Sequence, residues 1–226
     1  MDESISSLKR TARLTGFVYF IFALTAIYGY LYVSSKAKII PGDAGATANN
    51  ILANEFLYRT GILSSIISVT LFIVTALLLY KLLKSVDEFQ AKLMVAFVAV
   101  HVAISFVLLA CRITALRILK GDILNGVEPE QLQDLAMIFF RFRESAILIG
   151  IWLLPLAYLV YKSGFIPRLF AVLLFLCGIG YIADSITFVL FPEYRNAVSQ
   201  ITIWFEAVGE PLFILWLMIF GVRVKK

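Results

Sequence analysis

Charged residues lie inside or at the edges of the long apolar stretches of this 226-residue chain. Side chains of these types at these positions could take part in binding or catalysis. A charge in hydrocarbon costs roughly 2.5–3.5 kcal/mol on insertion scales, so such residues normally face a bundle interior or a watery cavity. The set consists of Arg112, Arg143, Glu144, Asp184, Glu206 and Glu210. These side chains could bind a small polar molecule, an ion or a lipid head group, and a glutamate could serve as a general acid or base.

The spacing of the glutamates sharpens this hypothesis. Glu206 and Glu210 are four residues apart and therefore share one face of a helix. Two carboxylates this close repel each other unless a cation lies between them or one holds a proton. Arg112 and Arg143 are their natural partners in the sequence. Secondary candidates are Glu55 and Arg59, whose i, i+4 spacing has the order that favours an ion pair on a helix.

His101, the only histidine, falls on the same helical stripe as Arg112 but about 16 Å deeper by helical rise. We interpret it first as a core histidine that is hydrogen-bonded to a neighbouring helix, with a site role as a further candidate. A single histidine gives a zinc or haem site little support, and we expect no metal and no cofactor. A cation site built only from the carboxylates of Asp184, Glu206 and Glu210 is left open.

Composition defines the elements that must position these residues. Hydrophobic residues make up 61% of the chain and charged residues 15%, whereas a soluble domain averages about 45–50% apolar and about 25% charged residues. We therefore predict an all-α, polytopic membrane helix bundle. Cys111 and Cys177 lie in apolar stretches and are expected to be free core residues. The aromatic residues, among them Tyr19, Trp152 and Trp204, are expected to include interface anchors.

Six apolar windows are each near or above the length that crosses a bilayer about 30 Å thick. We predict transmembrane helices at about 14–33, 61–83, 93–118, 137–161, 165–191 and 201–222. The fourth window is short, but a helix that begins near Glu130 could run through it. Six spans leave no room for a separate soluble domain, so residues 1–226 are expected to form a single integral membrane domain.

Basic residues predict the orientation of these spans. If the N-terminus is cytoplasmic, that side collects most of the lysines and arginines, namely Lys9, Arg10, Arg13, Lys81, Lys84, Lys92, Lys162, Arg168, Arg223, Lys225 and Lys226. This excess follows the positive-inside rule and predicts that both termini are cytoplasmic. The net charge of +5 is explained by this topology, so no nucleic-acid partner is expected.

The two longer outer connections carry helix start signals. Asp43 and Thr47 are candidate N-caps for a short surface helix that leads into the second span. Pro129 and Glu130 suit the first turn of a helix that leads into the fourth span. The outer connections between the helices are longer than the inner ones, and this difference favours a function on the outer face of the membrane.

Helical rise also places the intramembrane charges at a similar depth. Counted at about 1.5 Å per residue from the cytoplasmic anchors, the charged set lies in the outer half of the bilayer. The third to sixth helices therefore each contribute a charge to one level, where Glu55 and Arg59 could join them. This agreement predicts a charged pocket that opens to the outer side.

Several short motifs resemble one known family along almost the whole chain. They are Ile40-Pro-Gly-Asp-Ala44, Thr47-Ala-Asn-Asn-Ile51, Glu55-Phe-Leu-Tyr-Arg59-Thr-Gly61, Tyr161-Lys-Ser-Gly-Phe-Ile-Pro-Arg168, Gly178-Ile-Gly-Tyr181, and Gly209-Glu210 with Trp216. The chain is similar here to the bacterial multi-pass membrane proteins grouped as an uncharacterised "domain of unknown function" family. The resemblance implies six membrane helices, a bacterial source and an inner (plasma) membrane location. It implies no activity and no catalytic residue.

Three classes of function stay open. The first is an integral membrane protein whose charged pocket binds or moves a small polar molecule, an ion or a lipid head group. The second is an intramembrane lipid-modifying enzyme that uses Glu206 or Glu210 as acid or base. The third is a scaffold or accessory subunit whose buried ion pairs only fix the packing of its helices. The expected partners are the lipid bilayer and a small polar ligand or lipid, while the oligomeric state is not predicted.

Overall fold

The computed structural model describes residues 2–124, 126–141 and 147–223, and throughout this part of the chain the regular structure is helical, without strands. Within it, five helical stretches are long and apolar enough to cross a membrane: Ser6–Lys36, Glu55–Leu83, Glu88–Leu119, Arg168–Leu190 and Pro192–Ile219. Apolar segments form helices because a helix satisfies every backbone polar group within its own segment. The prediction of an all-helical, membrane-type protein is confirmed.

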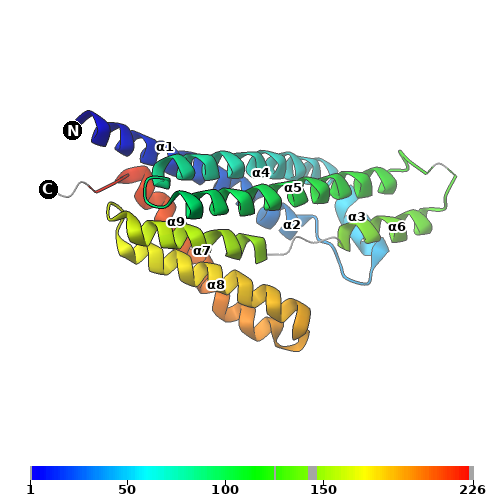
Figure 1. Ribbon diagram of the computed structural model, residues 1–226. Helices are drawn as coiled ribbons and strands as arrows, with labels where there is room; N and C mark the ends of the chain where they lie inside the picture. The colour runs from blue at the N-terminus through cyan, green and yellow to red at the C-terminus, as the bar shows by residue number, and fades with distance from the viewer. Residues whose placement is uncertain (1, 125, 142–146, 224–226) are drawn as a thin grey trace. The chain divides into compact units, whose positions relative to one another are not determined.

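The helices follow one another along the chain with short connections (Figure 1). The first stretch joins α1 (Asp2–Ala26), the π-helix η1 (Ile27–Tyr32) and α2 (Val33–Lys36). It is followed by α3 (Ala44–Ala53), α4 (Glu55–Leu83), α5 (Glu88–Leu119) and α6 (Pro129–Arg141). The C-terminal part contains α7 (Ile147–Ser163), α8 (Arg168–Leu190), the 3₁₀ turn η2 (Pro192–Tyr194) and α9 (Arg195–Ile219).

The predicted fourth span, 137–161, falls on α6 and α7. Helix α6 begins at Pro129, where the start signal is, and ends at Arg141. Helix α7 has only 17 residues and is shorter than the five long stretches. Residues 142–146 lie outside the described residues. The fourth span, and with it the total of six, therefore stays a prediction.

The chain divides into two compact units. Unit 1 consists of Met1–Ile21, Leu71–Val102 and Ser145–Lys226, and unit 2 of Phe22–Thr70 and Ala103–Glu144. Helices α4 and α5 each contribute residues to both units. The expectation of a single integral membrane domain stays a prediction.

In unit 1, α8 packs against both α7 and α9 (Figure 1). Helices α7 and α8 approach closely at two glycines, since a Cβ atom at Gly178 would lie 2.9 Å from the carbonyl oxygen of Gly150. Small residues permit such close packing of apolar helices. Trp152 of α7 is 1% exposed and meets the ring of Phe72 edge-on at 5.1 Å between ring centroids. Trp152 is therefore a core residue of unit 1 and not an interface anchor.

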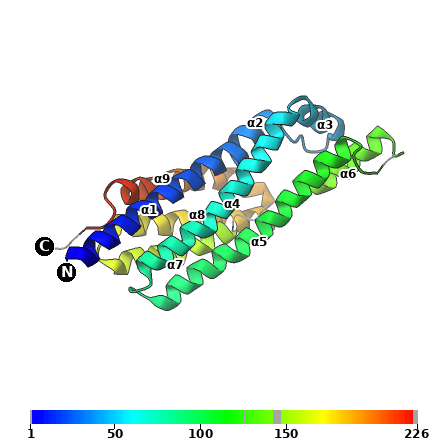
Figure 2. The same cartoon turned by 90° about the horizontal axis from the view of Figure 1, so that it is seen from above.

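In unit 2, the short helices α3 and α6 pack against each other (Figure 2). Asp43 caps α3 as predicted, because its Oδ1 atom accepts a hydrogen bond of 2.8 Å from the backbone N–H of Ala46. The core of this unit is apolar and includes Ile51, Tyr58 and Phe140, from α3, α4 and α6. These short helices thus share one core with the unit 2 part of the long helices.

Candidate functional site

Glu210 of α9 is a candidate centre of chemistry in unit 1, because two other helices supply polar atoms to its carboxyl group. The hydroxyl of Tyr19, from α1, donates a short hydrogen bond to Glu210 Oε1. The thiol of Cys177, from α8, lies 4.0 Å from Glu210 Oε2. Tyr19 is 1% exposed and its ring packs at a tilt against Trp152. Tyr19, which the sequence places among expected interface anchors, is therefore a buried partner of Glu210.

Two glycines bring α9 close enough to its neighbours for these contacts. A Cβ atom at Gly209 would lie 2.9 Å from the carbonyl oxygen of Leu173 in α8. On α1, a Cβ atom at Gly16 would lie 2.7 Å from the Cα atom of Met218. Real Cβ atoms do not tolerate these separations from a backbone, so glycine is required at both crossings. The close approach holds Glu210 between α1 and α8.

Pro211 directly follows Glu210, and α9 continues through it to Ile219. Proline has no N–H group, so the helix lacks the hydrogen bond that this residue would donate to the carbonyl four positions earlier. That carbonyl belongs to Ala207, one turn before Pro211. An additional hydrogen-bond acceptor therefore lies next to the Glu210 turn of the helix.

Glu206 and Asp184 continue the row of carboxylates along α9 and α8. Glu206 is one turn from Glu210 and lies beside α8, because a Cβ atom at Gly180 would be 3.8 Å from Glu206 Oε1. Asp184 interacts electrostatically with Glu206, and its Oδ1 atom accepts a short hydrogen bond from the hydroxyl of Ser199. All three carboxylate side chains are partly buried. We call Asp184, Glu206 and Glu210 the acidic row.

The acidic row has hydroxyl partners where ion pairs were expected. Within the described residues, salt bridges join Glu55 to Arg59 and Lys120, and Glu88 to Lys92, and none of them includes a member of the row. Hydroxyl donors stabilise a carboxylate without neutralising it. Among the described residues, the members of the row therefore have hydroxyl donors and no cationic partner.

Among the described side chains, no set of three or more histidines, cysteines, aspartates and glutamates has the geometry to hold a metal ion. Both cysteines are free thiols, as predicted. His101 lies in unit 1, where it is 6% exposed and meets the ring of Phe72 edge-on at 5.3 Å. This buried position agrees with the interpretation as a core histidine.

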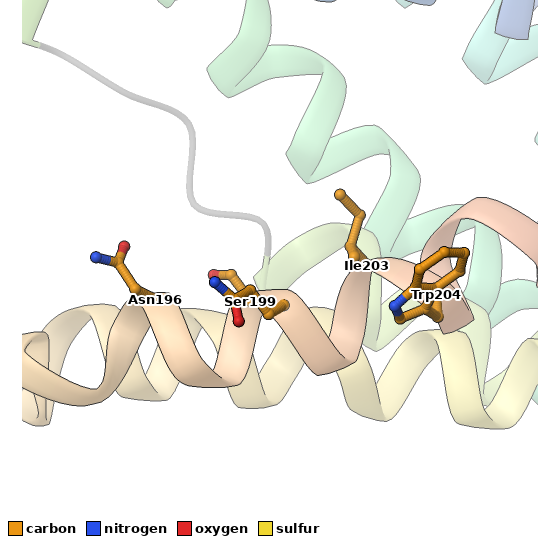
Figure 3. A pocket seen from close by; sticks show the side chains of 5 residues that line it. Asn196, Ser199, Ile203 and Trp204 are labelled. Carbon is orange, nitrogen blue, oxygen red and sulfur yellow. The ribbon is translucent and has the colours of Figure 1, made fainter.

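A hollow of about 590 Å³ lies along the N-terminal half of α9. It is lined by Asn196, Ser199, Gln200, Ile203 and Trp204, whose spacing puts them on one face of the helix (Figure 3). Ser199 connects this hollow to the acidic row, because its hydroxyl is bonded to Asp184. The polar residues of this face were not among the predicted site residues, although their i, i+3, i+4 spacing in an apolar stretch was a detectable signal.

The other predicted site residues lie elsewhere. Arg112 belongs to unit 2, where its guanidinium lies over the ring of Tyr30 at 5.3 Å. Glu55 Oε1 accepts hydrogen bonds from Arg59 Nε at 2.7 Å, as predicted, and from Lys120 Nζ at 2.9 Å. Arg143 and Glu144 lie outside the described residues. Of the predicted set, the structure thus brings together the three members of the acidic row, and a pocket that includes the arginines stays a prediction.

Comparisons with known proteins place the chain without assigning a reaction. A family model described as "Domain of unknown function (DUF4386)" matches residues 14–221. A protein from Archaeoglobus fulgidus, printed as "Uncharacterized protein", is 32% identical over 96 residues. That match covers 42% of this chain and 56% of the relative, so the chain spans only about half the length of this relative. No solved structure matches the chain.

Proposed function

This chain belongs to the DUF4386 family, whose shared domain has no known function, and we propose that it is a multi-pass membrane protein that binds or moves a small positively charged solute or lipid head group. The acidic row of unit 1 is the binding site in this proposal. Glu210 holds the positive charge, while Glu206 and Asp184 extend the site toward the hollow along α9. The ligand class is an amine or another monovalent cation, since the described side chains offer no metal-binding cluster.

One observation carries this proposal, namely the partners of Glu210. A carboxylate inside an apolar bundle is expensive unless it is paired or hydrogen-bonded. Glu210 is bonded to the hydroxyl of Tyr19 and lies beside the thiol of Cys177, and no described basic group lies within ion-pair distance. A positively charged ligand would supply the missing compensation.

The two alternatives receive less support from the same contacts. A scaffold held by buried ion pairs requires that the acidic row be paired, whereas the described ion pairs are formed by Glu55 and Glu88. A lipid-modifying enzyme requires a nucleophile or an activated water beside its acid or base. The nucleophilic groups found beside Glu210 in the described part of unit 1 are the thiol of Cys177 and the hydroxyl of Tyr19, and both side chains are buried.

The membrane arrangement is part of the same proposal. We infer six spans, with α7 and the residues before it forming the fourth, and both termini on the cytoplasmic side. The bacterial source and the inner-membrane location rest on the family resemblance. In this topology the acidic row faces the outer half of the bilayer, so its ligand would enter from outside.

The proposal is tested by charge-selective labelling of the hollow. A Ser199→Cys variant, in a background with Cys111→Ser and Cys177→Ser, places one thiol beside Asp184. The reagents are a cationic and an anionic methanethiosulfonate of similar size, applied to the full chain in proteoliposomes. We expect the cationic reagent to react at least about tenfold faster, because an acid-lined, wet site concentrates cations.

A second variant attributes this preference to the acidic row. Asp184→Asn should lower the ratio of the two rates toward one, whereas Glu88→Gln, which removes an exposed carboxylate of unit 1, should leave the ratio unchanged. A thiol that reacts with neither reagent would show a closed, dry site. Equal rates with both reagents would show that the row attracts no cation. Either result would overturn the proposal.

A further inference from the structure

Arg112 also lacks a counterion among the described residues, and its surroundings in unit 2 differ from those of the acidic row. Its guanidinium lies over the ring of Tyr30, with 5.3 Å between the guanidinium carbon and the ring centroid. The side chain is partly buried, and no described carboxylate lies within ion-pair distance of it. A ring face attracts a cation but leaves its N–H groups available to acceptors.

Tyr30 owes its position to the π-helix η1, which is inserted between α1 and α2. Gly29 lets this turn pack tightly on α4, because a Cβ atom there would lie 2.9 Å from the carbonyl oxygen of Gly61. The hydroxyls of Tyr28 and Thr60 fix the same contact with a hydrogen bond of 2.9 Å. Single π turns within longer helices occur frequently at functional sites. The inserted turn here fixes an aromatic ring beside Arg112.

Tyr58 supplies an independent observation. Its side chain is 7% exposed, and its buried hydroxyl has no hydrogen-bond partner in the part of the chain that the structure describes. Tyr58 belongs to the same core cluster as Ala115 and Leu116, which lie one helical turn beyond Arg112 on α5. Its ring packs edge-on against Phe140 in the apolar core of unit 2. A buried donor of this kind is normally paired, so the hydroxyl of Tyr58 lacks an acceptor.

The local charge determines the sign of that missing acceptor. Glu55, at the start of α4, is already bound by both Arg59 and Lys120. The guanidinium of Arg112 carries a positive charge and only N–H donors, so an anionic acceptor suits it. Arg112 lies seven residues before the end of α5 at Leu119, about 10 Å along the helix. Such a depth suits the head group of a lipid as well as a small solute.

We propose that Arg112 and Tyr58 bind a phosphate group, either free or in a lipid head group. The planar guanidinium donates two parallel hydrogen bonds to two phosphate oxygens. A further oxygen accepts the hydroxyl hydrogen of Tyr58, which satisfies the unpaired donor. This site uses no residue of the acidic row, so a test of it does not depend on whether the proposed cation site exists.

The experiment measures thermal unfolding of the purified full chain with two probes. Inorganic phosphate is added to the detergent-solubilised protein, with chloride at equal ionic strength as the reference. In parallel, the protein is measured in nanodiscs of phosphatidylglycerol and in reference nanodiscs without phosphate. The reference nanodiscs consist of a neutral glycolipid with added diacylglycerol. Stabilisation by free phosphate indicates a small solute, and stabilisation by phosphatidylglycerol alone indicates a lipid. The absence of both effects would overturn the proposal.

Three variants locate the effect. Arg112→Gln should abolish stabilisation by the effective probe. Tyr58→Phe should weaken its binding about tenfold or more, as expected for a lost hydrogen bond to a charged group. Arg117→Gln, which removes an exposed arginine of the same helix, should bind like the unchanged protein. Equal losses in Arg117→Gln and Arg112→Gln would reduce the effect to general surface charge and contradict the proposal.

The ligand-free Tyr58→Phe protein provides a test that does not depend on the folding of the arginine variant. Removing an unpaired buried hydroxyl should leave the unfolding temperature unchanged or raise it, because the donor is unsatisfied without ligand. If this variant is destabilised without any probe, the hydroxyl already has a partner. The site as proposed would then be wrong.

Discussion

Glu210 in unit 1 and Glu55 in unit 2 are the same residue type in opposite surroundings. Glu55 lies at the start of a helix, is partly exposed, and is bound by two cationic side chains. Glu210 of α9 lies between α1 and α8 and is bound by the hydroxyl of a fully buried tyrosine. Solvent lowers the desolvation cost of the Glu55 ion pairs. A charge within the bundle has no solvent beside it to lower its desolvation cost.

This difference identifies the carboxylate that is better suited to bind a ligand. A fixed arginine or lysine beside a carboxylate occupies the place that a cationic ligand would take. A hydroxyl donor holds the carboxylate in position and leaves it able to attract a positive charge. We therefore place the candidate function at Glu210, and we interpret the Glu55 cluster as a surface feature of unit 2.

The largest effect is expected from separating the helices that hold Glu210. In Gly209→Ala, the new Cβ atom would lie 2.9 Å from the carbonyl oxygen of Leu173, so α9 must move away from α8. We expect a loss of about 3 kcal/mol in the free energy of unfolding, as for an overpacked core. Thermal or chemical unfolding in detergent measures this loss.

Gly45 of α3 is the matched control in unit 2. A Cβ atom at Gly45 would meet only the side-chain oxygens of Gln133 and Asp43, at 3.4 and 3.7 Å. Gly45→Ala should therefore be neutral or stabilise the helix by up to about 1 kcal/mol. If both variants destabilise the protein equally, the glycine at 209 has no special packing role, and the geometry of the Glu210 site loses its basis.

A smaller loss of stability is expected from removing the hydroxyl group that donates a hydrogen bond to Glu210. Tyr19→Phe keeps the ring against Trp152 and leaves the carboxyl of Glu210 without its donor. We expect a destabilisation of about 1–2 kcal/mol, toward the upper range of hydrogen bonds in membrane proteins. The measurement is again the free energy of unfolding in detergent.

Tyr28→Phe sharpens this prediction, because Tyr28 is bonded to the neutral hydroxyl of Thr60 in unit 2. Its loss should destabilise the protein by less, about 0.5–1 kcal/mol. A double variant of Tyr19→Phe with Glu210→Gln should cost less than the sum of the two single changes, since the residues form one unit. Additive losses would contradict a direct coupling between Tyr19 and Glu210.

The features that follow from local sequence were predictable. The apolar windows gave the long helices, Asp43 caps α3, and α6 begins at Pro129. The spacing of Glu55 and Arg59 predicted their ion pair. Each of these features depends on residues within one or two helical turns, where periodicity and capping act.

The contacts of the candidate site were not predictable in the same way. Tyr19 and Glu210 are separated by 191 positions, and Glu55 and Lys120 by 65. Such pairs depend on which helix faces pack together, and an apolar residue pattern facing lipid on many sides does not specify those faces. Tyr19 was therefore predicted as an interface anchor, and the sequence did not indicate the hydroxyl groups that donate to the acidic row.

The smallest effect is expected at the surface cluster. Lys120→Met removes one of the two cations bound to Glu55, while Arg59 keeps its contact of 2.7 Å. The unfolding temperature should fall slightly at low salt and match the unchanged protein at high salt, because exposed ion pairs are weak and are screened by salt. Lys38→Met, which removes an exposed lysine of the same unit, controls for the change in net charge.

A loss of stability as large as that of Tyr19→Phe, and independent of salt, would show that the Glu55 cluster stabilises the packing of the helices. The contrast with Glu210 would then no longer separate a surface feature from a binding site.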